Sequence, residues 1–427
     1  MWCGNQKKEI TLLVMSMRLL KYAFIEDYAE DNWFNTPCDL KATYDVVIIG
    51  AGGHGLACAH YLAQDHGITN VAVLDSSYIG GGNTGRNTTI IRSNYLTPDG
   101  VKFYDQSIKL FKDLSCELDT NIFFSERGHY TLAHNTSTLR TARWRAEVNK
   151  HLGIKSEVVS PDEVLRACPE IQLDCGGSQA VEGALYHEPG AVARHDAVAW
   201  GYAKSASGRG VEIHQHTPVT GINTDSQGIS EVVTPKGVIK TRTVLSAVAG
   251  QTPSITKMVG VKTPIEIFPL QACVTEPIKP WLNTIIVSGS LHMYLSQSSR
   301  GELVMGAALD PMELHSRRST FEFVTGLCDQ VLDLFPFLSG VKINRQWAGM
   351  ADMTPDFAPI MGMTPVKGFF LDSGWGTWGF KATPISGKTM ANTIATNLND
   401  PLIQSFNLDR FKNFNLVGEK GAAAIGH

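Results

Sequence analysis

A glycine-rich turn between an apolar strand and a helical run constrains the fold of this chain more than any other feature. The segment "DVVIIG" predicts a buried strand, "GLACAHYLAQDHG" has helical spacing, and "VAVLD" predicts a second buried strand. Gly50 permits the tight turn, Gly52 lets the backbone approach a pyrophosphate, and Gly55 lets helix and strand pack closely. Gly53 and His54 lie in the same turn, where we expect His54 to act through its backbone. The segment therefore predicts the β-α-β start of a doubly wound α/β domain that binds a dinucleotide.

The residues after this unit distinguish between dinucleotides. Asp75 ends the second strand, where its carboxylate can accept a hydrogen bond from an unphosphorylated ribose, which fits FAD or NAD but not NADP. The loop "GGGNTGRNTTIIRSNY" follows at once, with the donors Asn83, Thr84 and Thr88 and the apolar Ile90. Such a loop can wrap the far half of a pyrophosphate and the sugar chain of a flavin, for which an NAD enzyme has little use. The sequence therefore favours FAD.

A later segment offers a place for the adenine. Val219 in "HTPVTGI" is expected on a short strand whose backbone could hydrogen-bond the ring edge. The same letters are equally typical of an ordinary strand, so this position depends on the rest of the site. For the glycine motif itself, the alternative is an incidental turn, but strand, spacing and acid together favour the cofactor.

The chain has 427 residues, which is too long for one hydrophobic core. The segments "TVLSAVAGQTPS" and "GFFLDSGWGTWGFKATPISGKTMANTIATNL" repeat the strand-then-glycine pattern, whereas "LHMYLSQSSRGELVMGAAL" alternates as antiparallel strands do. We therefore predict a discontinuous FAD-binding domain and an inserted α+β substrate domain built on an antiparallel sheet. The predicted boundaries are residues 40–115, 185–255 and 341–400 for the FAD-binding domain, 116–184 and 256–340 for the substrate domain, 1–39 for an N-terminal extension and 401–427 for a C-terminal tail.

Composition and charge argue against several classes of partner. The 37 basic and 41 acidic residues give a net charge of -4 without any block of like charge, so neither a nucleic-acid surface nor a polybasic membrane patch is expected. Eight irregularly spaced cysteines without a C-x-x-C pair argue against a zinc site or a disulfide scaffold and favour a reducing, cytoplasmic setting. The stretch "TLLVMSMRLLKYAF" is too short to span a bilayer and lacks a signal-peptide cleavage site. Met15 or Met17 could replace Met1 as the start of translation.

Several motifs in combination resemble one family. They are "GAGGHGLACAHYLA", "GGNTGRNTTIIRSNYL", "ARHDAVAW", "GELVMGA", "GWGTWGFKATP" and the terminal "GAAAIGH". From about Trp33 onward, the chain resembles the β subunits of heterotetrameric sarcosine oxidases. The wider superfamily includes glycine oxidase, monomeric sarcosine oxidase and the dimethylglycine dehydrogenases.

This resemblance implies a subunit with two flavins, namely non-covalent FAD and an FMN attached through its 8α-methyl group to His195. A neutral imidazole can attack the electrophilic 8α carbon, although the residues alone favour an ordinary helix-start histidine beside Asp196. The resemblance also implies sarcosine as substrate and O2 as the acceptor, reached through FMN with release of hydrogen peroxide. It further implies α, γ and δ subunits, with tetrahydrofolate and NAD bound by partner subunits.

Sarcosine is a small zwitterion, so its carboxylate requires a cation. Arg92 matches the carboxylate-binding arginine of the monomeric relatives, and Lys381 matches the second cation of the family. The corresponding alternatives are a surface arginine and a lysine that caps a helix. Gly376 and Gly379 allow close approach of a helix that begins near Thr383, whose positive end would face the flavin.

Two departures from the monomeric relatives agree with each other. Those relatives tether FAD to a cysteine before a "TPD" sequence, whereas Gly349 occupies that place in "AGMADMTPD". They also activate oxygen with a lysine, whereas Val304 in "GELVMGA" occupies the matching place. Untethered FAD that reacts poorly with oxygen would pass its electrons to FMN.

Two other functions stay open. The substrate could be another N-alkyl amino acid, such as dimethylglycine or N-methylproline, because the two cations recognise only a carboxylate. The chain could instead be a catalytically idle, flavin-binding structural subunit, against which the presence of both cations argues. We also expect Tyr95 and Tyr294 to shape the pocket above the flavin.

Overall fold

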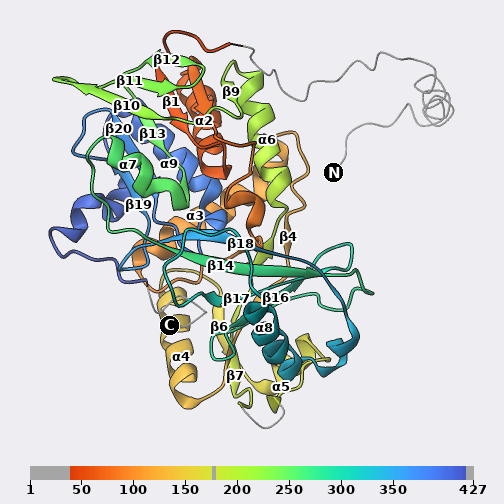
Figure 1. Ribbon diagram of the computed structural model, residues 1–427. Coiled ribbons are helices and arrows are strands. Elements are labelled where there is room, and N and C mark those ends of the chain that lie inside the picture. The colour runs from red at the N-terminus through yellow and green to blue at the C-terminus, as the bar shows by residue number, and fades with distance from the viewer. Residues whose placement is uncertain (1–38, 176–178, 420–427) are drawn as a thin grey trace, which may run out of the picture. The chain divides into compact units, whose positions relative to one another are not determined.

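The structure is a computed structural model that describes residues 39–175 and 179–419 (Figure 1). The predicted N-terminal extension, the start of translation and the "GAAAIGH" motif lie outside these residues, apart from position 39. Within them, no helix is long and apolar enough to cross a membrane. In the same part of the chain, no group of three or more His, Cys, Asp or Glu side chains is placed to hold a metal ion.

A six-stranded sheet, in the order β19-β20-β13-β1-β2-β9, carries the glycine motif. All neighbouring strands are parallel except the edge pair β19 and β20. The chain passes from β1 to β2 on one side and later places β13 on the other, so a crevice opens at the carboxyl end of β1, where such sheets bind ligands. The predicted doubly wound fold is confirmed. The strands are β1 (Val46–Ile49), β2 (Val71–Leu74), β9 (Glu212–His214), β13 (Val244–Ser246), β19 (Ile360–Met363) and β20 (Phe369–Ser373).

Both faces of this sheet are covered, which explains the continuous apolar run in β1. Val47 and Ile49 pack with Ile222 and Val232 of the antiparallel sheet β10-β11-β12. On the other face, α2 packs against α6 and α9, and α9 packs against α3 (Figure 1). These elements are α2 (Gly53–His66), α3 (Pro98–Glu117), α6 (His195–Gly208), α9 (Thr383–Thr396), β10 (Gly221–Asp225), β11 (Gly228–Thr234) and β12 (Gly237–Lys240).

The second large sheet has eight strands, in the order β18-β14-β17-β16-β15-β5-β7-β6. Its pairs are antiparallel except β15 with β5, which confirms the predicted α+β architecture on an antiparallel sheet. The domain boundaries stay a prediction, and β18 lies in this sheet although it follows predicted boundary 341. The strands are β5 (His129–Ala133), β6 (Ser156–Val159), β7 (Gly183–His187), β14 (Glu266–Thr275), β15 (Ile285–Ser288), β16 (Met293–Gln297), β17 (Leu303–Leu309) and β18 (Ile343–Met353).

Helices cover opposite faces of the eight-stranded sheet. Leu327 and Val331 of α8 belong to the core cluster that contains Ala184 of β7, whereas Ala146 of α4 packs on the next residue, Leu185. Successive residues of a strand point to opposite faces, so α8 and α4 lie on different sides. In the sequence, α4 and α5 lie between the strands of residues 116–184. The helices are α4 (Thr136–His151), α5 (Pro161–Ala167) and α8 (Phe321–Leu334).

Short elements connect the two large sheets. The three-stranded sheet β3-β8-β4 lies beside β15 and β16, since Ile90 and Val192 pack against Val287 and Tyr294. The short elements are β3 (Ile90–Ile91), β4 (Ser125–Glu126), β8 (Ala191–Val192), α7 (Thr252–Met258), η1 (Thr84–Arg86), η3 (Ala249–Gln251), η4 (Pro336–Gly340), η5 (Phe380–Ala382), η6 (Pro401–Phe406) and η7 (Leu408–Phe411).

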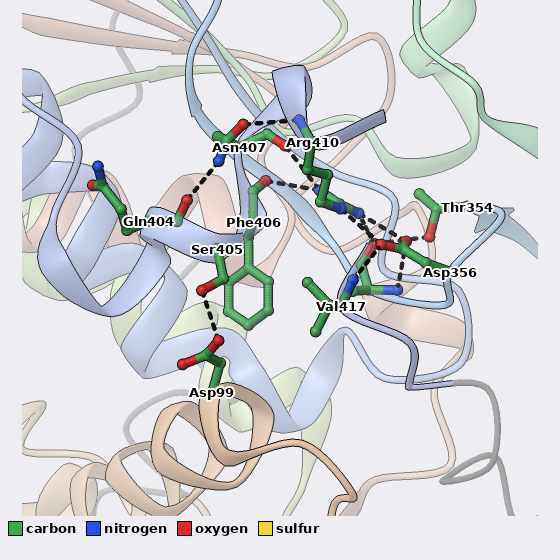
Figure 2. Close-up of polar contacts among 10 residues, drawn as sticks. Asp99, Thr354, Asp356, Gln404, Ser405, Phe406, Asn407, Arg410 and Val417 are labelled. Carbon is green, nitrogen blue, oxygen red and sulfur yellow. Dashed lines mark hydrogen bonds and ion pairs between the residues drawn. The ribbon is translucent and has the colours of Figure 1, made fainter. Parts of the chain in front are cut away.

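A buried ion pair anchors the C-terminal segment to the loop after β18 (Figure 2). Arg410 donates from Nε and Nη2 to the two carboxylate oxygens of Asp356, at 2.8 and 2.9 Å. The same guanidinium donates to the carbonyl oxygens of Phe406 and Ala358, and Val417 N–H donates to Asp356. The arginine side chain is 0% exposed and the aspartate 1%. This charge pair is fully desolvated, so its stability depends on both members being present.

Candidate active site

The glycine turn has the backbone geometry that its sequence predicts. Gly50 follows β1 with φ of +111°, and a Cβ there would lie 2.5 Å from the carbonyl oxygen of Ala247. A Cβ on Gly55 would overlap the Gly50 carbonyl oxygen, because α2 and β1 meet there. Only glycine fits these two positions. The turn therefore brings unobstructed backbone and the N-terminus of α2 to the crevice beside β1, where an anion is favoured.

Asp75 and Thr84 hold the turn from two sides. The Ala51 N–H donates to Asp75 Oδ2 at 2.8 Å, and Ser77 N–H donates to Asp75 Oδ1 at 2.7 Å. The Ser77 hydroxyl also donates to Oδ1 at 3.0 Å, so Oδ2 is the oxygen that can accept a second hydrogen bond, from a ribose hydroxyl. Thr84 Oγ1 accepts from Gly53 N–H at 3.0 Å, which closes the second glycine-rich loop over the first. The two predicted loops thus form one wall.

Two cavities run along this wall and share part of their lining. Most of the predicted cofactor residues line the first cavity, and most of the predicted substrate residues line the second. Asn83, Asn87, Gly376 and Phe380 line both, so the cavities are contiguous. The predicted residues in the first are Gly50, Gly52, Gly53, His54, Asp75, Asn83, Thr84, Val219, Gly376 and Gly379, and those in the second are Asn83, Thr88, Ile90, Arg92, Tyr294, Gly376 and Lys381.

Asn83, which was predicted to donate to the cofactor, also forms hydrogen bonds within the protein. Its Nδ2 donates to the Met350 carbonyl oxygen at 2.6 Å, and its Oδ1 accepts from Met350 N–H at 3.0 Å. The side chain therefore ties the second glycine-rich loop to β18 like a strand neighbour. One amide hydrogen of Asn83 remains available for a ligand, since the Nδ2 group carries two.

Asp352 is a cavity residue that sequence reasoning missed. Its side chain is 1% exposed on β18, and its Oδ2 accepts from Gly374 N–H at 2.6 Å. Its Oδ1 is buried without a hydrogen-bond partner among the described residues. Burial raises the pKa of Asp352 to about 6, against the opposing effect of the N–H donors around it. An acid inside the apolar strand "AGMADM" was the available signal, because such a residue is seldom buried without a ligand or partner.

The FAD predicted from the sequence fits these residues. An orphaned acceptor such as Asp352 Oδ1 suits a hydroxyl-bearing chain, and FAD carries one between its ring system and its pyrophosphate. The glycine turn suits the pyrophosphate, and Asp75 and Val219 line the end of the cavity expected for the adenosine.

Arg92 and Lys381 come from distant parts of the chain and line the same cavity. Arg92 is 4% exposed, stacks over the Tyr95 ring at 4.8 Å, and donates to Asn94 Oδ1 at 2.8 Å. Arg145 donates to the Asn94 carbonyl oxygen at 2.6 Å from behind. Arg92 is therefore held in a fixed orientation at the cavity wall.

Lys381 is a buried amine next to another cation. It is 7% exposed, and within the described residues it forms no ion pair with an acid. Burial first, and then the charge of Arg92, lower the pKa of Lys381 well below its usual value. The Ser107 hydroxyl donates to the Lys381 carbonyl oxygen at 2.6 Å and fixes the backbone of η5. A buried amine of this kind is suited to take up a proton when an anion arrives.

Of the two tyrosines expected above the flavin, one lies at the cavity. Tyr294 lines the second cavity, whereas Tyr95 does not line it but packs behind Arg92 and Trp378 and stacks on Tyr104 with ring centroids 3.9 Å apart. His129 also lines the second cavity and was not predicted. Burial, followed by the charge of Arg92, lowers the pKa of His129 well below its usual value, so this imidazole is neutral.

The two departures from the monomeric relatives occupy different places. Gly349 lines the second cavity, and a Cβ there would lie 3.4 Å from Asn83 Oδ1. Val304 lies on β17 but lines neither cavity. Residue 349, where the relatives have the cysteine, is therefore part of the cavity wall, whereas residue 304 is not.

His195 is placed apart from the two cavities, whose linings do not include it. It is the first residue of α6, is half-buried, and hydrogen-bonds the backbone of Gly85. Burial, partly offset by Asp196, lowers the pKa of His195 and keeps the imidazole neutral. Gly85 belongs to the same loop as Thr84, so one loop lies between His195 and the first cavity.

Comparisons with known proteins are consistent with this geometry. The family model described as "FAD dependent oxidoreductase" matches residues 45–393. The chain is 41% identical to sarcosine oxidase subunit beta from Arthrobacter sp, over 94% of this chain and 99% of that protein. It is 42% identical to the subunit of the same name from Rhodobacter capsulatus, over 91% and 93%. The crystal structure of L-proline dehydrogenase from P. horikoshii superposes with a TM-score of 0.83 at 27% identity, covering 88% of this chain and all of that one.

Proposed function

Because the chain belongs to the FAD-dependent oxidoreductase family, we propose that it oxidises sarcosine to glycine as the β-type flavoprotein subunit of a sarcosine oxidase. The relatives named sarcosine oxidase subunit beta support an amine donor. The observation that carries the proposal is the pair of buried cations, Arg92 and Lys381, in a cavity contiguous with the dinucleotide cavity. Such a pair suits a small carboxylate placed beside a flavin.

The chain's residues would hold FAD without a covalent link. The glycine turn and the α2 N-terminus bind the pyrophosphate, Asp75 accepts from the ribose, and Asp352 accepts from the sugar chain of the flavin. Thr383 begins α9 and lines the first cavity, so the positive end of α9 favours negative charge there. When bound, FAD supplies the acceptor for a hydride equivalent from the N-methyl carbon.

Arg92 and Lys381 would bind and prepare the substrate. The guanidinium of Arg92 holds the carboxylate with its planar fork, which Asn94 keeps in orientation. Sarcosine arrives with a charged amine, and Lys381 Nζ, whose lowered pKa favours the deprotonated form, accepts one proton from it. The substrate nitrogen thereby regains its lone pair, and the new ammonium of Lys381 pairs with the carboxylate. Burial of both cations excludes water and strengthens these interactions.

The route of electrons after this site is also part of the proposal. We propose that they pass to an FMN bound covalently to His195 through its 8α carbon, and then to O2 with release of hydrogen peroxide. The neutral imidazole of His195 supports the attachment, and its hydrogen bond to Gly85 supports a short path from the first cavity. We also propose partner α, γ and δ subunits, with tetrahydrofolate and NAD on partners, in the cytoplasm. Among the described residues, the cysteines at 58, 116, 168, 273 and 328 form no disulfide, which agrees with such a setting.

Changing His195 to Asn should remove the flavin that survives denaturation and leave the extractable FAD in place. The amide cannot form the histidyl bond, whereas the FAD cavity does not include residue 195. Acid precipitation of the complex, followed by absorbance of pellet and supernatant, measures both flavins. His151→Asn, at an exposed position, is the matched control. A pellet from the unchanged protein without yellow colour would contradict the covalent FMN.

Anaerobic spectrophotometry tests the proposed reaction. Sarcosine should bleach the flavin of the assembled complex, and air should then restore the colour with hydrogen peroxide as product. The same assay with dimethylglycine and N-methylproline compares the alternative substrates, for which the similarity to an L-proline dehydrogenase is a specific reason. If dimethylglycine or N-methylproline bleaches the flavin faster than sarcosine, that compound is the preferred substrate. If none of the three bleaches the flavin, the chain is not an amine oxidase.

A further inference from the structure

The ring of His54 bridges the glycine turn and the loop that leads to Lys381. Its Nδ1 lies 3.1 Å from Asp372 Oδ1, and its Nε2 lies 2.8 Å from the Gly379 carbonyl oxygen. The ring also packs edge-on against Trp375, with centroids 4.6 Å apart. The sequence predicted only a backbone role for His54, but its side chain is also engaged. Because Asp372 lies next to the last residue of β20 and Gly379 precedes η5, this one ring joins three parts of the first cavity.

The hydrogen-bond partners determine the protonation state of this ring. A carbonyl oxygen can only accept, so the Nε2 that faces Gly379 must carry a proton. Asp372 Oδ1 already accepts from Trp375 Nε1 at 2.6 Å, and Asp372 Oδ2 accepts from Ser386 Oγ at 2.6 Å. With Asp372 ionised, both of its carboxylate oxygens are acceptors only, and Nδ1 then carries a proton as well. Either neutral tautomer would leave a ring lone pair against an oxygen lone pair.

The charged groups around His54 agree with an imidazolium. Asp372 faces it from β20 and Asp352 from β18, whereas α9 contributes the neutral Ser386. Burial alone would lower the pKa of His54, but the charge and hydrogen bond of Asp372 outweigh burial, and the pKa is raised. A positive charge paired with a buried carboxylate also avoids leaving Asp372 uncompensated.

We propose that His54 is an imidazolium in the folded protein, and that its two donated hydrogen bonds hold the Gly374–Gly379 loop against the pyrophosphate turn. His54 is thus a positioning residue that couples retention of FAD to the placement of Lys381. This inference rests on FAD binding and not on the identity of the amine. A failed sarcosine assay would therefore leave it intact.

The proposal predicts a pH dependence with a definite sign. The folded pKa of His54 is raised above its unfolded value of about 6.5, so the stabilisation is fully present below that value. It is lost as the pH rises through the folded pKa. FAD should consequently dissociate more readily from the unchanged protein at alkaline pH.

Nuclear magnetic resonance of protein labelled with ¹⁵N-histidine tests the charge directly. At pH 6.5, where an ordinary histidine is about half protonated, both ring nitrogens of His54 should show predominantly the signature of protonated nitrogen. The resonance is assigned by its loss in His54→Asn or His54→Gln. If neither variant folds, the nuclear Overhauser contact to the Trp375 indole identifies His54 in the unchanged protein. A neutral-tautomer signature for His54 would overturn the proposal.

Titration of the apoprotein with FAD provides a second, activity-free measurement. At pH 6.5, His54→Asn should raise the FAD dissociation constant about tenfold, as expected for the loss of charge-assisted hydrogen bonds. The ratio between variant and unchanged protein should shrink as the pH rises, and His151→Asn should show no change. A ratio that stays constant with pH would contradict the imidazolium and indicate a purely steric role.

Discussion

Replacing Lys381 with Met is expected to lower the rate of flavin reduction by sarcosine about 30- to 4,000-fold while FAD stays bound. Met keeps the unbranched shape of the side chain but can neither pair with the carboxylate nor accept the amine proton. Loss of one partner of a buried charge pair costs about 2–5 kcal/mol, and each 1.4 kcal/mol is a factor of ten. Stopped-flow mixing under anaerobic conditions measures the rate. Lys388→Met, on the exposed side of α9, is the matched control and should reduce at the unchanged rate.

The same variant tests the proton accounting at this site. The pKa of Lys381 is held well below its usual value by burial and by Arg92, and a bound carboxylate should raise it again. Between these two values, binding of acetate should take up as much as one proton per site. Calorimetry in buffers of different ionisation enthalpy counts that proton, and Lys381→Met should remove the uptake. If the unchanged protein and Lys381→Met take up the same number of protons, the proton is bound by a group other than Lys381. An unchanged reduction rate in Lys381→Met would instead favour an idle subunit.

The second large effect is expected on stability, at the ion pair between Arg410 and Asp356 (Figure 2). Arg410→Met should lower the free energy of unfolding by about 3–5 kcal/mol, because it leaves a buried carboxylate without its partner. Urea unfolding of the FAD-loaded protein measures this change. Ser405→Ala removes the more exposed hydrogen bond to Asp99 in the same segment and should change stability by less than about 1 kcal/mol.

A double variant separates the charge from the packing. Changing Asp356 to Leu together with Arg410→Met should recover part of the loss, since no unpaired charge remains. Burial alone would raise the pKa of Asp356, but Arg410 outweighs burial and lowers it. The contribution of the pair is therefore present above the unfolded pKa of about 3.9 and lost as the pH falls through the folded value. Additive losses in the double variant would contradict the coupling.

Local spacing in the sequence was sufficient for the cofactor turn. The separations of Gly50, Gly52 and Gly55 are set by the geometry of one strand and one helix, and Asp75 lies at the end of the adjacent strand. Such short-range relations need no knowledge of the rest of the fold. The same holds for the paired strands β16 and β17. Their alternation of apolar and polar residues could be recognised in the sequence because one face of that sheet packs in the core with α8.

The distribution of side chains around the cavities was decided by tertiary structure. Arg92 and Lys381 line one cavity because β3 and η5 pack together, and no spacing in the chain encodes that contact. Asp352 lines the first cavity and His129 the second, because the pairing of β14 with β18 and of β5 with β15 determines which faces meet. The charge on the His54 ring was likewise invisible in its motif. It follows from acceptors more than 300 residues away, Asp372 and Gly379, that only the folded chain brings to its two nitrogens.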